Sequence, residues 1–211
     1  MSTLSIVCID TIHHERAELA VLQTWECLNH TQQPVQCVYW LSDQMFSMAG
    51  RLPIIHHPIS KIENFPYEYN YHCLHTLPWL IQEDHVLVVQ WDGYAVNSQA
   101  WTQEFLCYDY IGAVWPSSLA PVHASVGNGG FSLRSKRLLN CLKNLQIDYN
   151  YPEDNTICIH QRHVLQSQGI VFAPENLAHQ FSIEQCWNNS WFTKSFGFHG
   201  LNALAHYPRQ S

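Results

Sequence analysis

The sequence VLVVQWDGYAVN, at Val86–Asn97, carries the clearest structural signal in the chain. Four apolar residues, three of them valines, run without polar alternation, and the acidic residue Asp92 follows shortly after them. Such a run predicts a strand of a parallel sheet that helices cover on both faces. Ligands of these sheets bind at the carboxyl ends of the strands, where we expect Asp92 to lie. Asp92 can hold a divalent cation there and, through it, a diphosphate, or it can simply begin an Asp-Gly turn.

The residues before this stretch alternate between strand and helix patterns. The predicted strands are Leu4–Ile9, Val35–Leu41, a weaker edge piece at Arg51–Pro58, and Val86–Gln90, and the predicted helices are Glu15–Asn29 and a segment from Tyr69 to Ile81. This alternation indicates an α/β domain with a mostly parallel central sheet and helices on both faces. The chain has 211 residues, which suits one domain over 1–211.

The pattern changes after Asp92, where glycine and proline break the chain more often. We expect a helix at Trp101–Tyr108, a strand at Tyr110–Val114 and then a long loop to Val126. A short strand at Phe131–Leu133 should follow, and then a helix at Lys136–Asn144 with Ser135 as its N-cap. The last predicted elements are a helix at Asn155–Ser167, which ends before Gly169, and a short strand at Ile170–Ala173.

Composition excludes several classes of function. The formal net charge is −7 and only ten Lys and Arg are present, so a nucleic-acid surface is not expected, and a phosphate-bearing ligand would need a metal as its counter-charge. The eight cysteines contain no Cys-x-x-Cys pair and most lie among apolar neighbours, as reduced cysteines do in cytoplasmic proteins. Neither a signal peptide nor a transmembrane segment is evident, which also favours a cytoplasmic location.

Three further pieces carry candidate chemistry. The loop Gly127–Gly130 fits neither a dinucleotide fingerprint nor a Walker loop. In one interpretation its glycines let the backbone approach a ligand and Asn128 binds sugar hydroxyls. In the other, the loop is an ordinary Asn-Gly turn. The pair Glu153-Asp154 predicts either a helix cap or a general base. His199 differs from the other thirteen histidines because aromatic and glycine neighbours surround it.

These pieces together resemble nucleotide-sugar glycosyltransferases of the GT-A fold. More closely, the chain is similar to a bacterial family of glycosyltransferase-like proteins of largely unassigned function. The similarity covers about Tyr69–Gly200 and depends on five motifs, which are QWDG, YDYIGAVWP, VGNGGFSLRS, PEDN and FGFHG. Each motif alone is weak, and their joint occurrence in this order is specific.

The resemblance implies a role for each matching residue. Asp92 would be the remaining acid of an Asp-x-Asp metal motif with Gln90 at its first position, and His199 would share the cation, Mn²⁺ or Mg²⁺. Asp154 would deprotonate the acceptor hydroxyl, and Glu153 would hydrogen-bond the sugar. The residues that would line the donor site are Asn128, Gly129 and Gly130 around the sugar, and Asp10 and Thr11 at the base.

The function that follows is metal-dependent transfer of a sugar from a nucleotide-sugar donor to an acceptor hydroxyl of a glycan or glycoconjugate. Among nucleotide sugars, a UDP-sugar is the expected donor. A base in line behind the anomeric carbon predicts inversion. The incomplete Asp-x-Asp keeps a non-catalytic nucleotide-sugar or carbohydrate-binding module open as the alternative. A sugar-phosphate nucleotidylyltransferase is disfavoured because the loop after the first strand, DTIHHER, has no glycine.

Overall fold

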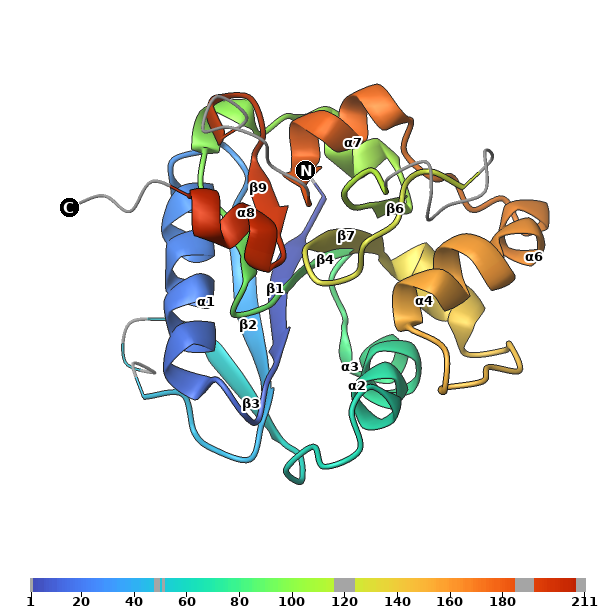
Figure 1. Ribbon diagram of the computed structural model, residues 1–211, viewed down its shortest axis with the longest axis horizontal. Helices are drawn as coiled ribbons and strands as arrows, with labels where there is room; N and C mark the ends of the chain where they lie inside the picture. Colours follow the sequence, from blue (N-terminus) through green and yellow to red (C-terminus); the bar gives the residue numbers. More distant parts are fainter. Residues whose placement is uncertain (1, 48–49, 51, 116–123, 185–191, 208–211) are drawn as a thin grey trace.

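The structure is a computed structural model that describes residues 2–47, 50, 52–115, 124–184 and 192–207. A six-stranded sheet runs through its centre in the order β3-β2-β1-β4-β7-β6 (Figure 1). These strands are β1 (Leu4–Ile9), β2 (Val35–Ser42), β3 (Ile54–Pro58), β4 (His85–Val89), β6 (Tyr110–Ile111) and β7 (Ser132–Ser135). The four strands from β3 to β4 are parallel, whereas β7 is antiparallel to both of its neighbours. The predicted α/β fold is confirmed.

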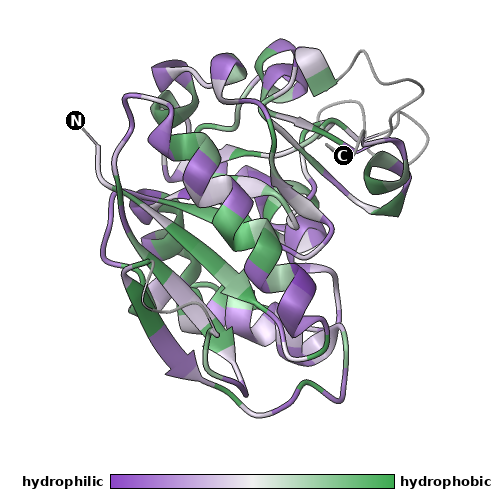
Figure 2. Ribbon diagram, turned by 90° about the vertical axis from the view of Figure 1, so that its left-hand side faces the viewer, coloured by the Kyte–Doolittle hydropathy of each residue, from purple (hydrophilic) through white to green (hydrophobic). Residues whose placement is uncertain are grey.

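Helices cover both faces of the sheet, as the apolar runs predict. Along β1, Ile6 and Cys8 belong to one hydrophobic cluster, and Val7 and Ile9 belong to another on the opposite face. The first cluster packs under α1 (His14–Asn29) and α7 (Glu175–Phe181); the second packs under α2 (Tyr67–Tyr71), the π-helical η2 (His72–Thr76), α3 (Leu77–Leu80), α4 (Lys136–Leu142) and α6 (Arg162–Ser167). Hydropathy follows the same arrangement, since the central strands are hydrophobic and the helices alternate (Figure 2).

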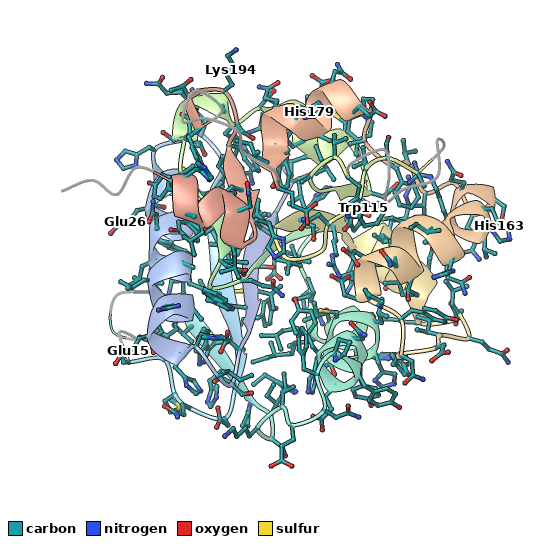
Figure 3. All side chains as sticks on the ribbon, viewed as in Figure 1. Glu15, Glu26, Trp115, His163, His179 and Lys194 are labelled. Atoms are coloured by element: carbon teal, nitrogen blue, oxygen red, sulfur yellow. The ribbon has the colours of Figure 1, made fainter. Side chains whose placement is uncertain are left out.

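Polar side chains lie on the outer surfaces of these helices. Glu15 and Glu26 are exposed on α1, and His163 is exposed on α6 (Figure 3). Seven of the eight cysteines lie in described ranges, and all seven are free, five of them buried. None of the helices in the described ranges has the length and hydrophobicity of a segment that spans a bilayer.

A second, three-stranded sheet, β5-β9-β8, was not predicted. Its strands are β5 (Gly93–Ala95), β8 (Ser182–Ile183) and β9 (Gly197–His199), and α8 (Leu201–His206) follows β9. Only residues 90–92 separate β4 of the main sheet from β5. Since β5 pairs with β9, the second sheet brings the carboxyl-terminal part of the chain next to the end of β4.

Several predicted boundaries are wrong. The helix predicted at 101–108 is wrong, because this segment contains only the short 3₁₀ turn η4 (Gln103–Cys107), and a second such turn, η3 (Ser98–Ala100), precedes it. The strand predicted at 110–114 ends at Ile111. The edge strand begins at Ile54 instead of Arg51, and α4 ends at Leu142 instead of Asn144. Ser135 caps α4 as predicted, because its side chain accepts from the N–H of Leu138. Most of the loop 115–126 lies outside the described residues.

The helix predicted at 155–167 is divided into three segments. It begins earlier, as α5 (Glu153–Asn155), continues as the π-helical η5 (Thr156–His160) and ends as α6. The N–H of Gln161 donates to the carbonyl of Thr156, five residues back, which widens the turn and interrupts the α-helix. Gly169 has a φ of +85°, the left-handed conformation expected after a helix end.

Asp109 explains why 170–173 forms no strand. Phe172 makes a single bridge to Tyr110, while the Asp109 carboxylate accepts from the N–H of Val171 at 2.7 Å. The same carboxylate accepts from Ser135 Oγ at 2.5 Å and from the Arg137 guanidinium. Burial would raise the pKa of Asp109, but these hydrogen bonds hold it below its usual range.

We expect Asp109→Asn to lower the free energy of unfolding by about 2 kcal/mol at neutral pH, because a buried donor loses its acceptor. The folded-state pKa of Asp109 is depressed, so the carboxylate contributes its stability above its unfolded pKa and loses it as the pH falls through the folded value. The difference between the variant and the wild type should therefore shrink in acid below about pH 4. Urea denaturation at several pH values measures it, and the exposed Asp148→Asn is the matched control.

Candidate active site

A tight turn after β4 positions the first candidate residues. The backbone N–H of Gln90 donates to the carbonyl of Gly93 at 2.9 Å, and the N–H of Gly93 donates back at 3.0 Å. Asp92 therefore lies in a turn, as one interpretation of the sequence predicts. Its side chain is nevertheless 14% exposed and lines a cavity at the carboxyl end of the strand, as the other predicts. The turn and the position at the strand end are both confirmed, and the binding of a cation by Asp92 stays a prediction.

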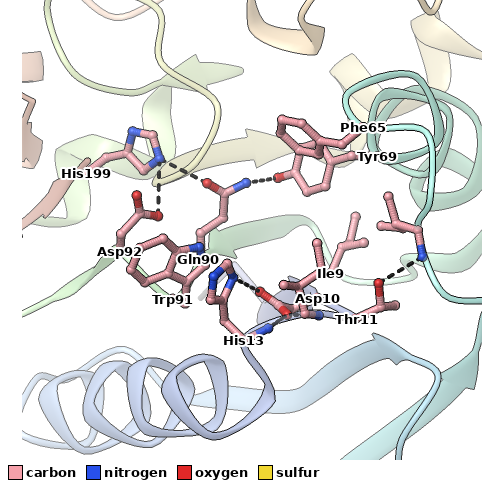
Figure 4. A pocket seen from close by; sticks show the side chains of 12 residues that line it. Ile9, Asp10, Thr11, His13, Phe65, Tyr69, Gln90, Trp91, Asp92 and His199 are labelled. Atoms are coloured by element: carbon pink, nitrogen blue, oxygen red, sulfur yellow. Dashed lines mark hydrogen bonds and ion pairs between the residues drawn. The ribbon is translucent and has the colours of Figure 1, made fainter. Parts of the chain in front are cut away.

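Pairing of β5 with β9 brings His199 to this turn. Gly93 is opposite His199 in the antiparallel register, and the N–H of Gly200 donates to the carbonyl of Asp92 at 2.9 Å. As a result, Nε2 of His199 lies 3.8 Å from Oδ1 of Asp92 and 2.9 Å from Oε1 of Gln90 (Figure 4). The structure thus brings together the two side chains predicted to share a cation.

Gln90 links His199 to the opposite wall of the cavity. Its Nε2 donates to the Tyr69 hydroxyl at 2.5 Å, so its Oε1 faces His199. With this amide orientation, His199 carries its proton on Nε2, a tautomer assigned from the hydrogen bonds. Two oxygens and one imidazole nitrogen therefore converge, which is a donor set that suits Mn²⁺ or Mg²⁺. Within the described ranges no group of three His, Cys, Asp or Glu is gathered around one point, so the protein would supply only part of the coordination shell.

The cavity has a volume of about 410 Å³. It lies between the carboxyl ends of β1 and β4, which are parallel neighbours. Its lining consists of Ile9, Asp10, Thr11, Ile12, His13, Ile62, Phe65, Tyr69, Gln90, Trp91, Asp92 and His199 (Figure 4). Five predicted site residues, from three distant parts of the sequence, therefore share one cavity.

Asp10 and Thr11 shape the loop after β1. Oδ1 of Asp10 accepts from the N–H of Ile12 at 2.7 Å and from that of His13 at 2.5 Å. The Thr11 hydroxyl oxygen accepts from the N–H of Ile62 at 2.9 Å. Both residues lie on the cavity wall, although their contact with a nucleobase stays a prediction, and these polar atoms already bind the protein's own backbone.

Aromatic rings form the rest of the wall. The Trp91 ring lies 4.4 Å from the His13 ring, centroid to centroid, and the Arg16 guanidinium lies over Trp91 at 5.5 Å. Opposite them, the rings of Phe65 and Tyr69 are 5.9 Å apart, and Phe65 is exposed at the mouth. Such faces suit a planar ring such as a nucleobase.

The glycine loop packs against protein side chains. A Cβ on Gly129 would lie 1.4 Å from Oε1 of Glu153, and one on Gly130 would lie 2.0 Å from Nε2 of His199. We predicted that these glycines let the backbone approach a ligand. The structure gives a different reason, which is that Glu153 and His199 occupy the space where a side chain would be.

The acidic pair lies behind this loop. Oδ2 of Asp154 accepts from the N–H of Gly129 at 3.1 Å, and Oδ1 accepts from the N–H of Asn155 at 2.8 Å. The N-cap of α5 is Pro152, and the N–H of Glu153 donates to Oδ1 of Asn70 at 3.2 Å, so the prediction that the acidic pair caps this helix is wrong. Neither Glu153 nor Asp154 lines the 410 Å³ cavity itself.

Glu153 forms a buried ion pair that the sequence did not reveal. Its side chain is 4% exposed, and its Oε2 lies 2.8 Å from Nη2 of Arg134, which is fully buried. Burial raises the pKa of Glu153 to about 7, against the opposing effect of the guanidinium. Arg134 also donates to the carbonyl of Gly129 at 3.3 Å and to Ser132 Oγ at 3.1 Å.

Glu184 is a second residue that sequence reasoning missed. It follows β8, and the Asn128 side chain hydrogen-bonds to its carboxylate. Burial raises the pKa of Glu184, while this hydrogen bond opposes the rise. Asn128 itself is buried and has a φ of +62°, which fits the Asn-Gly turn interpretation. A single Glu after a two-residue strand carries no pattern by which it could have been found.

Solved structures with the same fold include glycosyltransferases. A glycosyltransferase involved in the glycosylation of the major capsid of PBCV-1 aligns with a TM-score of 0.57 and 10% identity, covering 97% of this chain and 96% of that one. The galactosyltransferase LgtC, solved with donor and acceptor sugar analogues, has a TM-score of 0.54 and 11% identity, with 94% and 87% covered. The fold of this chain is therefore a GT-A-like glycosyltransferase fold.

A mannosyltransferase from Pyrobaculum calidifontis, solved with GDP-Man and Mn²⁺, aligns with a TM-score of 0.56 and 10% identity over 82% of this chain. This chain spans only 55% of the length of that protein. No curated protein matches the sequence. The sequence does match, over residues 59–199, a family described as "Protein of unknown function (DUF5672)", and because the match covers most of its length, the chain belongs to that family.

Proposed function

We propose that the protein is a metal-dependent glycosyltransferase that moves a sugar from a nucleotide-sugar donor to an acceptor hydroxyl, with inversion. One observation carries the proposal: Gln90, Asp92 and His199 converge on the cavity that the loop after β1 also lines. In α/β sheets, ligands bind at these strand ends. The fold shared with glycosyltransferases supports the same conclusion.

A divalent cation fits the three converging side chains. Gln90, Asp92 and His199 would hold Mn²⁺ or Mg²⁺, and the diphosphate of the donor would complete its coordination shell. The bound cation would offset the charge of the leaving diphosphate. The protein needs such a positive charge to bind a diphosphate, because its own net charge is −7. In the free protein the proton on Nε2 of His199 points to Gln90, so metal binding would displace that proton.

The donor would extend from the aromatic end of the cavity to the glycine loop. The nucleobase, uracil in the first place, would lie beside Asp10 and Thr11, between the rings of Trp91 and Phe65. The sugar would lie against Asn128, Gly129 and Gly130, where Glu153 was predicted to contribute a hydrogen bond. The acceptor would be a glycan or glycoconjugate.

Asp154 would act as the general base. Its carboxylate is partly exposed and is held by the N–H groups of Gly129 and Asn155, which leave lone pairs on both oxygens. It would take the proton of the attacking hydroxyl while the bond to the diphosphate breaks. Attack from the side opposite the leaving group inverts the anomeric carbon.

A non-catalytic nucleotide-sugar or carbohydrate-binding module is the second candidate. The observation that favours it is the amide of Gln90 at the position of the first acid of an Asp-x-Asp motif. An amide oxygen carries no net charge and binds a cation more weakly than a carboxylate does. Donor binding without turnover would distinguish this candidate from the enzyme.

Metal-dependent donor binding tests the proposal. We expect the melting temperature of the wild type to rise by about 5–10 °C when a matching donor from a panel of UDP-glucose, UDP-galactose and GDP-mannose is added at about 100 times its Kd with Mn²⁺. Asp92→Ala and His199→Ala should remove the Mn²⁺-dependent part of this rise, because each deletes one ligand. Differential scanning fluorimetry with and without Mn²⁺ measures it.

His163→Ala, which removes an exposed histidine on α6, is the matched control and should respond as the wild type does. A donor response that is the same without Mn²⁺, or that survives in Asp92→Ala, would contradict the metal site. The absence of any response to the panel or to UDP and GDP would contradict the proposed function itself.

A further inference from the structure

Two buried hydrogen-bond acceptors near the glycine loop have no partner among the residues that the structure describes. They are Oδ1 of Asn128 and Oε2 of Glu184. Nδ1 of His199 is also unpaired there, but it would carry the ring proton once Nε2 bound a metal, so it is not an acceptor for the ligand. Buried polar atoms are nearly always paired, so two unpaired acceptors in one neighbourhood indicate a place that a ligand with hydrogen-bond donors completes.

Sheet pairing explains why these three residues are neighbours. Ser182 and Ile183 of β8 pair in parallel with Gly197 and Phe198 of β9, so the next residue on each strand is Glu184 and His199. The Asn128 side chain hydrogen-bonds to the Glu184 carboxylate, and both His199 and Asp154 act electrostatically on that carboxylate. Glu184 is therefore close to both the candidate metal ligand and the candidate base.

The chemistry of this group selects one kind of ligand. The free oxygens of Asn128 and Glu184 both accept hydrogen bonds, so the groups they bind must donate, as sugar hydroxyls do. Two carboxylates, Glu184 and Asp154, lie close enough to affect each other, which disfavours a third carboxylate on the ligand. A neutral sugar with free hydroxyls meets both conditions, whereas a uronic acid meets only the first.

We propose that Asn128 and Glu184 form a hydroxyl-binding pair that selects a neutral hexose as the donor sugar and rejects acidic sugars. This inference rests on the proposed function and deepens it. Asn128 holds the Glu184 carboxylate with its amide N–H, and the two remaining oxygens accept from hydroxyls of the sugar. A site built in this way discriminates strongly, because a ligand without those hydroxyls leaves buried acceptors unpaired.

The test compares each donor with its own nucleoside diphosphate. With Mn²⁺ present, calorimetric titrations of UDP-glucose, UDP-galactose and GDP-mannose are set against those of UDP and GDP, and UDP-glucuronic acid is the acidic probe. We expect at least one neutral donor to bind about 10- to 100-fold more tightly than its diphosphate, and Glu184→Gln to abolish that gain without changing the affinity for the diphosphate. UDP-glucuronic acid should bind no more tightly than UDP.

A second variant and a control keep the result interpretable. Asn128→Gly removes the other acceptor and keeps the positive φ at no conformational cost, so it should lose the same gain. Glu175→Gln, on the exposed start of α7, should leave every affinity unchanged. The inference is overturned if Glu184→Gln keeps the gain in affinity of the donor over its diphosphate, or if it weakens the binding of donor and diphosphate equally. It is also overturned if no neutral donor binds more tightly than its diphosphate, or if UDP-glucuronic acid binds as tightly as a neutral donor. If neither UDP nor GDP binds the wild type, the proposed function fails, and that result is distinct from the others.

Discussion

Asp154→Asn is expected to lower turnover about 10²- to 10⁴-fold while donor affinity stays within about threefold of the wild type, since this is the range that a general base contributes. Asn keeps the shape of Asp and retains an acceptor for the N–H of Gly129, which Asp154 binds at 3.1 Å, so the loop should stay in place. The measurement is release of nucleoside diphosphate from the bound donor in the presence of Mn²⁺, with water as the acceptor.

Asp148→Asn provides the comparison, because Asp148 is an exposed loop carboxylate a few residues away, and its replacement should leave turnover unchanged. Equal loss of binding and turnover in Asp154→Asn would show that the carboxylate only supports the loop. A wild type that binds a donor, releases no diphosphate and is unaffected by Asp154→Asn would favour the binding module.

The main sheet was predictable because its strands have a strong local signal. The runs Leu4–Ile9 and Val86–Val89 are apolar on both faces, and in the structure their alternate side chains do enter two separate hydrophobic clusters. The second sheet had no such signal. Its strands are two or three residues long, and the pairing of Gly93 with His199 depends on contacts between distant parts of the chain, which propensity does not report.

The candidate site was predictable where a motif marks it. The positions of Asp92 and His199 followed from the resemblance, and they lie 3.8 Å apart, although their binding of a cation stays a prediction. The residues that support the motif were not predictable. Arg134 occurs in the strand sequence FSLRS, where a charged residue would normally point to solvent, and only its buried partner Glu153 explains it. The adjacent glycines 129 and 130 likewise pack against the side chains of Glu153 and His199, which no local sequence pattern shows.

Arg134→Met is expected to destabilise the protein by about 3–5 kcal/mol, because it removes one partner of a buried ion pair. The guanidinium lies 2.8 Å from Glu153 and also holds the carbonyl of Gly129, so the variant leaves a buried carboxyl and a buried carbonyl without their donor. Without Arg134, nothing opposes the effect of burial, and the pKa of Glu153 should rise further above its present value of about 7. Since the folded-state pKa is then far above the unfolded one, stability falls as the pH rises toward it. Urea denaturation of the variant, followed by tryptophan fluorescence, should therefore show a greater loss at pH 8 than at pH 6.

The double variant Arg134→Met with Glu153→Gln separates the ion pair from the packing of Arg134. Once Glu153 cannot ionise, the pH dependence should disappear and part of the stability should return, because the cost of an unpaired buried charge is gone. Lys143→Met, which removes a cation that lies over the Trp79 ring at 4.5 Å, should cost less than about 1 kcal/mol. Equal losses in the single and double variants at both pH values would mean that Arg134 acts through its contacts with Gly129 and Ser132 alone. In that case the glycine loop, and not the charge of Glu153, would be what Arg134 holds in place beside Asp154.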